Sequence, residues 1–111
     1  MSVDIRHPDL NQIVSADAER EALSEAFGFT EGPIWNPHER HVTFSDIPAS
    51  KLFRWSEADG FSVYRDPTNM ANGNTYDAAG RILTCEHASS QVRREEDGAL
   101  TVIASHYDGK E

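Results

Sequence analysis

The chain has a single cysteine, Cys85, among its 111 residues. A disulfide framework is therefore impossible, and a cysteine-ligated metal site is not expected. Basic residues are scarce as well, because 10 Lys and Arg stand against 19 Asp and Glu, which gives a formal net charge of −9. Since an acidic surface repels phosphate groups and anionic lipids, we expect neither a nucleic-acid partner nor a membrane partner.

Long apolar runs are also missing. No stretch approaches the length of a membrane span, so a transmembrane helix is not expected. The first twenty residues lack the apolar run of a secretory signal peptide, and a cytoplasmic location is therefore expected. In place of that run they carry Asp4, Arg6, Asp9, Asp17, Glu19 and Arg20.

Residues 1–28 differ from the rest in their pattern of residue types and are predicted to form an N-terminal extension. Ser15 is a suitable N-cap, residues 16–26 are rich in Ala and Glu, and Gly28 is a suitable terminator. The pattern predicts a short helix that begins after Ser15 and lies on the surface, because it contains few apolar residues.

From Phe29 onward, short runs of β-branched and aromatic residues alternate with turn signals such as Asn36-Pro37, Asp59-Gly60 and Asp97-Gly98. This alternation predicts an all-β meander. The expected strands cover residues 32–35, 41–46, 52–55, 61–64, 75–76, 81–85, 91–94 and 100–104.

The strand pattern repeats after about 40 residues: residues 41–44 match 81–84, and residues 61–63 match 101–103. A four-strand unit with this period is typical of β-propeller blades, whereas two unrelated antiparallel sheets are the alternative. We predict a first blade at 29–68 and a second at 69–106. Residues 107–111 are then expected to begin the connection to a third blade that the 111 residues do not include.

Successive strands of a blade run in opposite directions, so the start of its first strand and the turn after its second lie at the same end. Polar residues with oxygen or imidazole groups occupy these positions: Glu31, Asp46, Asn72, Asn74 and His87. Oxygen ligands of this kind suit calcium, and Glu31 is the best candidate ligand. Asn72, Asn74 and His87 are candidate substrate-binding residues. The alternatives are blade-edge hydrogen bonding for Glu31, turn chemistry for the two Asn residues, and a solvated side chain for His87.

These segments resemble the SMP-30/gluconolactonase family. FTEGPIW at 29–35 is similar to the motif that opens its first blade, and FSDIP at 44–48 with LFRW at 52–55 to the rest of that blade. NGNTYD at 72–77 and GRILTCEH at 80–87 resemble the second blade of its bacterial branch. The resemblance implies a six-bladed propeller that hydrolyses sugar lactones with one divalent cation, most often calcium. It assigns Glu31 as a metal ligand, with the other ligands in later blades.

Three functions compete at this stage. The first is a metal-dependent lactonase of which this chain is an N-terminal part, with a small-molecule lactone as its ligand. The second is a catalytically inactive propeller fragment that binds other blades, or itself, through exposed blade edges. The third is a related propeller esterase or phosphotriesterase, because one fold supports several hydrolytic reactions.

Overall fold

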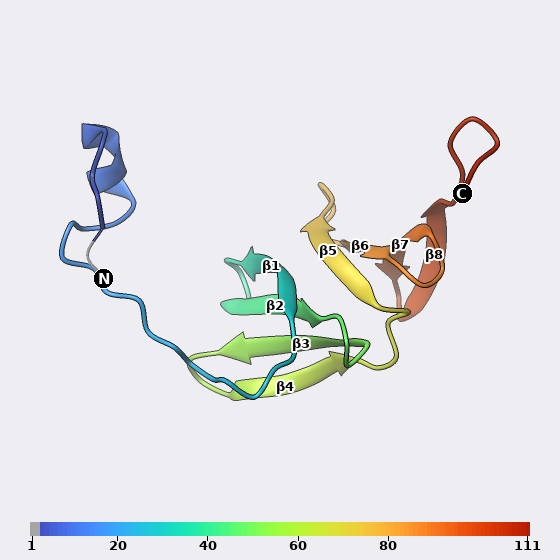
Figure 1. Ribbon diagram of the computed structural model, residues 1–111, viewed down its shortest axis with the longest axis horizontal. Helices are drawn as coiled ribbons and strands as arrows, with labels where there is room; N and C mark the ends of the chain where they lie inside the picture. Colours follow the sequence, from blue (N-terminus) through green and yellow to red (C-terminus); the bar gives the residue numbers. More distant parts are fainter. Residues whose placement is uncertain (1–2) are drawn as a thin grey trace.

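The computed structural model describes residues 3–111 and consists of two consecutive four-stranded antiparallel sheets (Figure 1). In each sheet the strands are hydrogen-bonded in chain order, which confirms the predicted pair of meander blades. The first sheet contains β1 (Thr30–Asn36), β2 (His41–Asp46), β3 (Lys51–Ser56) and β4 (Gly60–Arg65). The second contains β5 (Ala71–Tyr76), β6 (Ile82–Glu86), β7 (Gln91–Glu96) and β8 (Ala99–Ala104).

In the first hairpin of each blade, a polar side chain accepts hydrogen bonds from backbone amides of the loop. The Asn36 Oδ1 atom accepts hydrogen bonds from the amides of His38 and Glu39, both at 3.0 Å. In the second blade the carboxylate of Asp77 accepts from the amides of Ala79 and Arg81, both at 2.9 Å. The same hydrogen-bonding pattern therefore closes both hairpins, although four residues lie between Asn36 and His41 and three lie between the equivalent Asp77 and Arg81.

The two inner strands are longer than the sequence pattern predicts. We expected the second inner strand to cover residues 75–76, because Asn72-Gly73-Asn74 has the composition of a turn. In the structure these residues belong to β5, which begins at Ala71 and is interrupted by an irregular register. A Gly within a strand often marks a bulge, and this explains why the pattern was misleading here.

The helix expected within residues 16–26 is absent, and that prediction is wrong. The N-terminal helix of the described residues is instead a short 3-10 helix, Pro8–Gln12, with Pro at its start and His7 as its cap. Residues 19–26 are irregular, because an Ala- and Glu-rich helix of this length is marginal in water without an apolar face to bury. Phe27 ends the segment by inserting among Phe44, Phe53 and Phe61, with ring centroids 4.9–5.1 Å apart.

The core is small and lies where the two blades meet. Leu52, Ala71 and Ile82 are buried, and Ile34, Tyr64 and Tyr76 pack against them. The side chains of Thr43, Ser45 and Thr84 are buried as well, and Ser45 donates a hydrogen bond to the Asn72 carbonyl of the second blade. The described residues contain no helix with the length and hydropathy of a membrane span.

Candidate functional site

Both inner strands are irregular at the same end. The pairing of β1 with β2 shifts between Glu31 and Ile34, and the pairing of β5 with β6 shifts between Ala71 and Asn74. A bulge leaves ladder groups unpaired and redirects the neighbouring side chains, and bulges are frequent next to active sites. The candidate site is therefore built from two adjacent bulges, one from each blade.

The two bulges touch backbone to backbone. Gly32 has a φ of +61°, and a Cβ atom placed there would lie 2.1 Å from the carbonyl oxygen of Asn72. No side chain fits into that space, so glycine is required both by the left-handed conformation and by the close approach. The neighbour of Glu31 is thus packed directly on the inner strand of the second blade.

The side chain of Asn74 joins the two bulges. Its Nδ2 donates to the carbonyl oxygens of Gly32 and Asn72, both at 3.0 Å, and to Ser45 Oγ at 2.9 Å. Its Oδ1 accepts from Thr84 Oγ1 at 2.9 Å, while Ser45 Oγ donates to the Asn72 carbonyl at 2.7 Å. This amide, predicted to bind substrate, uses its hydrogen-bonding groups within the protein.

A buried carboxylate ends the second strand of each blade. Asp46 accepts from the amides of Gly28 at 3.0 Å and Phe29 at 3.1 Å, and so holds the segment that leads into β1. Glu86, forty residues later, forms an ion pair with Arg93 and accepts from Asn69 Nδ2 at 2.6 Å. Glu86 is not among the site residues predicted from the sequence, although it matches Asp46 forty residues earlier, which was a usable signal.

The environment of Glu86 has opposing effects on its acidity. Burial disfavours the charged form and raises the pKa, but hydrogen bonds from Arg93 and Asn69 outweigh burial. The pKa of this carboxyl group is therefore lowered, and Glu86 is an anion at neutral pH. Its charge serves the fold, because its oxygens are occupied by Arg93, Asn69 and Ser89.

The remaining predicted site residues lie at the same end of the two sheets. Glu31 is exposed at the start of β1, one residue after the pair formed by Thr30 and Asp46. Asn72 is half-buried in the bulge of β5, where its Oδ1 accepts from the amide of Gly73 at 2.7 Å. His87 is exposed in the turn that follows β6. Their assigned roles in metal or substrate binding stay predictions.

The described residues do not form a complete metal centre. Within residues 3–111, no three His, Cys, Asp or Glu side chains converge closely enough to hold an ion. Calcium takes about six to eight oxygen ligands, and the candidate site residues predicted from the sequence offer it one exposed carboxylate, that of Glu31. Residues 3–111 by themselves therefore do not fit the calcium ion that the family resemblance implies.

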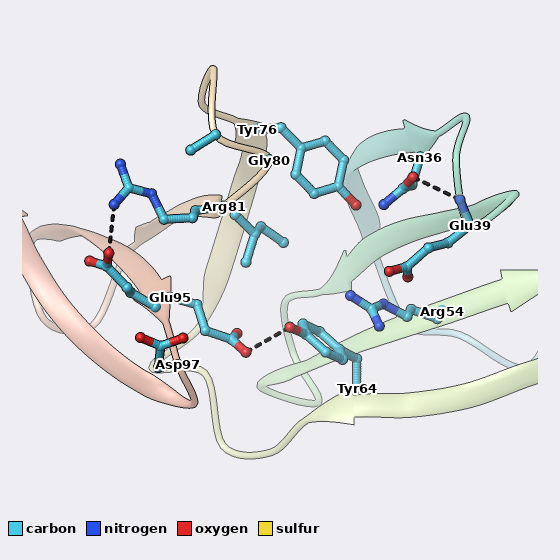
Figure 2. Close-up of a pocket in the computed structure, with 12 residues that line it drawn as sticks. Asn36, Glu39, Arg54, Tyr64, Tyr76, Gly80, Arg81, Glu95 and Asp97 are labelled. Atoms are coloured by element: carbon cyan, nitrogen blue, oxygen red, sulfur yellow. Dashed lines mark hydrogen bonds and ion pairs between the residues drawn. The ribbon is translucent and has the colours of Figure 1, made fainter.

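A polar cleft of about 360 Å³ separates the blades at their opposite end (Figure 2). Its charges are mostly paired with each other: Glu95 accepts from Tyr64 Oη at 2.7 Å and pairs with Arg65, and the Arg54 guanidinium lies 3.6 Å over the Tyr64 ring. Burial and the hydrogen bond to Glu95 raise the pKa of Tyr64. The hydrogen bond from Tyr64 and the ion pair with Arg65 thus connect the first blade to Glu95 of the second blade across this cleft. Tyr76 also lines it.

Comparison with known proteins gives a consistent result. The chain is 22% identical over 118 residues to a gluconolactonase of Zymomonas mobilis, a match that covers 93% of this chain and 33% of the relative. A structural genomics target, described as a gluconolactonase by family assignment, superimposes with a TM-score of 0.82 at 28% identity. That match covers 96% of this chain and 37% of the solved one.

A gluconolactonase from Xanthomonas campestris superimposes with a TM-score of 0.73 at 31% identity, over 78% of this chain and 30% of that one. The chain thus spans about a third of the length of the relatives it matches. The profile of the SMP-30/gluconolactonase/LRE-like region matches residues 29–111, which are the two blades and the residues that follow them. The chain therefore belongs to the SMP-30/gluconolactonase/LRE-like family.

Proposed function

We propose that the protein containing this chain hydrolyses sugar lactones and that residues 29–106 form two blades of its propeller. The observation that carries the proposal is the family match over 29–111, together with the similarity to gluconolactonases in sequence and structure. The geometry supports it, because adjacent bulges bring Glu31 and Asn72 to one end of the inner strands. That end is the natural place for a ligand on the propeller axis.

Within this proposal Glu31 supplies one oxygen ligand to a divalent cation, and calcium is the first candidate because the ligand is a carboxylate. The exposed carboxylate is available for this role, whereas Asp46 and Glu86 are occupied by amides and by Arg93. Further ligands are needed, because no three His, Cys, Asp or Glu side chains converge within residues 3–111. Asn72 and His87 are proposed to face the lactone and to form hydrogen bonds with its hydroxyl groups.

The test is a pH-stat assay of the complete protein with gluconolactone, an aryl ester and a phosphotriester, corrected for spontaneous hydrolysis. We expect the lactone to be turned over fastest. Faster turnover of the ester or phosphotriester would assign the protein to the related reaction instead. The 111-residue chain, assayed with added calcium, magnesium, manganese or zinc, is expected to show no metal-stimulated activity, because a single carboxylate binds calcium only weakly.

A further inference from the structure

The structure assigns Asn74 as a positioning residue that fixes the Glu31 bulge of β1 against the second blade. This role follows from the backbone carbonyl groups that the two bulges leave without a partner on the neighbouring strand. Where the β1 and β5 ladders shift register, the carbonyl groups of Gly32 and Asn72 depend on donors other than the neighbouring strand. Asn74 Nδ2 donates to both carbonyls at 3.0 Å, and Ser45 Oγ donates to that of Asn72 at 2.7 Å.

Only an amide side chain meets these requirements. The Nδ2 group donates to carbonyl oxygens on two different blades, while Oδ1 accepts from Thr84 on the neighbouring strand β6. An aspartate at position 74 has nearly the same shape but donates no hydrogen bond when ionised, and would place a negative charge against two carbonyl oxygens. The Asn74→Asp substitution therefore changes the hydrogen bonding and leaves the size of the side chain unchanged.

Blade architecture alone does not call for this amide. The inner strands match with an offset of 41 residues, which places Pro33 of β1 at the position equivalent to Asn74 of β5. The first blade thus forms its bulge without any equivalent side chain. Asn74 connects one blade to the next, and its contacts on the first blade are Ser45 and Gly32, the residue that follows Glu31.

The consequence for activity rests on the proposed function, in which Glu31 takes part in lactone opening. Small displacements of an active-site group are costly, because a shift of about 1 Å can lower a rate about 100-fold. We therefore expect Asn74→Asp in the complete protein to reduce kcat for gluconolactone on the order of 100-fold, with a much smaller change in KM. Asn36→Asp is the matched control, because Asn36 Oδ1 only accepts from two amides, as an aspartate would. Its kcat should stay at the wild-type level.

A second readout does not depend on activity. Hydrogen–deuterium exchange of peptides covering β1 and β5 should be faster in Asn74→Asp than in wild type, while peptides covering β3 and β4 keep their protection. If Asn74→Asp does not fold, Ser45→Ala replaces it, because this variant removes only the neighbouring hydroxyl group and should show the same local pattern more weakly.

The two readouts separate the possible failures. If wild type does not open lactones but exchange in β1 and β5 responds to the substitution, the proposed function is wrong and the positioning role stands. If wild type is active and Asn74→Asp keeps both its kcat and its exchange pattern, the positioning role is wrong. Faster exchange throughout both blades would also overturn the inference, because it would show a general contribution to stability.

Discussion

The contact between the two bulges can be tested by placing one methyl group at Gly32. In Gly32→Ala the new Cβ would lie 2.1 Å from the Asn72 carbonyl oxygen and 2.8 Å from Asn74 Nδ2, so the blades must move apart. The left-handed backbone conformation costs a non-glycine residue about 1 kcal/mol. Separation also breaks the hydrogen bonds from Asn74 to Gly32 and from Ser45 to Asn72, each worth about 1 kcal/mol. The expected loss in free energy of unfolding is therefore about 3 kcal/mol.

The chain offers two matched controls. Gly80 has a φ of +78° but no atom within 4 Å of an added Cβ, so Gly80→Ala measures the backbone cost alone, about 1 kcal/mol. Gly73 lies in the second bulge, has no such φ, and also leaves open space for a methyl group. Gly73→Ala should change stability little. The difference between Gly32→Ala and Gly80→Ala then isolates the contact between the blades.

Urea unfolding of the complete protein, followed by circular dichroism and by tryptophan fluorescence, measures these differences. The reasoning would be refuted if Gly32→Ala were no more destabilising than Gly80→Ala, because the inner strands would then not be in backbone contact. A loss in Gly73→Ala as large as that in Gly32→Ala would also contradict it, since it would show that any methyl group in these bulges is harmful.

Three further predictions concern the chain as a folding unit. The pKa of Glu86 lies below its ordinary 4.5, so the ionised carboxylate stabilises the fold at neutral pH, and this contribution is lost as the pH falls below about 4.5. In Glu86→Gln, the free energy of unfolding measured by urea titration should therefore depend less on pH in this range. Phe27→Ala should lower the free energy of unfolding by about 2 kcal/mol, which is less than for a fully buried ring because Phe27 is half-buried. An unchanged melting temperature would show that Phe27 does not anchor the N-terminal segment to the first blade. The isolated 111-residue chain should self-associate in analytical ultracentrifugation, because Val63, Val102 and Ile103 on the outer strands are 45–52% exposed; a monomer at all concentrations would contradict this.

The sequence was sufficient to predict the strands because the repeat supplies two independent copies of the same pattern. The match between residues 41–44 and 81–84 predicted the equivalent strands β2 and β6. Glu31 was predicted to lie at the same end as Asp46, and the register confirms that placement. Such features follow from chain direction and periodicity, which are visible in one sequence.

Contacts between the blades were not predictable in the same way. Asn72-Gly73-Asn74 has the composition of a surface turn, and only the approach of Gly32 shows that it is a bulge within a strand. The helix predicted after Ser15 does not form for a related reason: propensity and capping residues, its support, are local, whereas Phe27 packs on the first blade and holds the segment there. The conformational preference of a short segment is a weak predictor of its structure when the residues that it contacts lie about forty positions away in the sequence.

The most direct test of the proposed role of this chain is the effect of Glu31→Gln on lactone hydrolysis by the complete protein. A pH-stat assay with gluconolactone and added calcium, magnesium, manganese or zinc compares the variant with wild type, after correction for spontaneous opening. We predict metal-stimulated hydrolysis by wild type and its loss in Glu31→Gln, because the amide keeps the size of the side chain but removes the charge that a cation needs. Full activity of the variant would contradict the assignment of Glu31 to the active site.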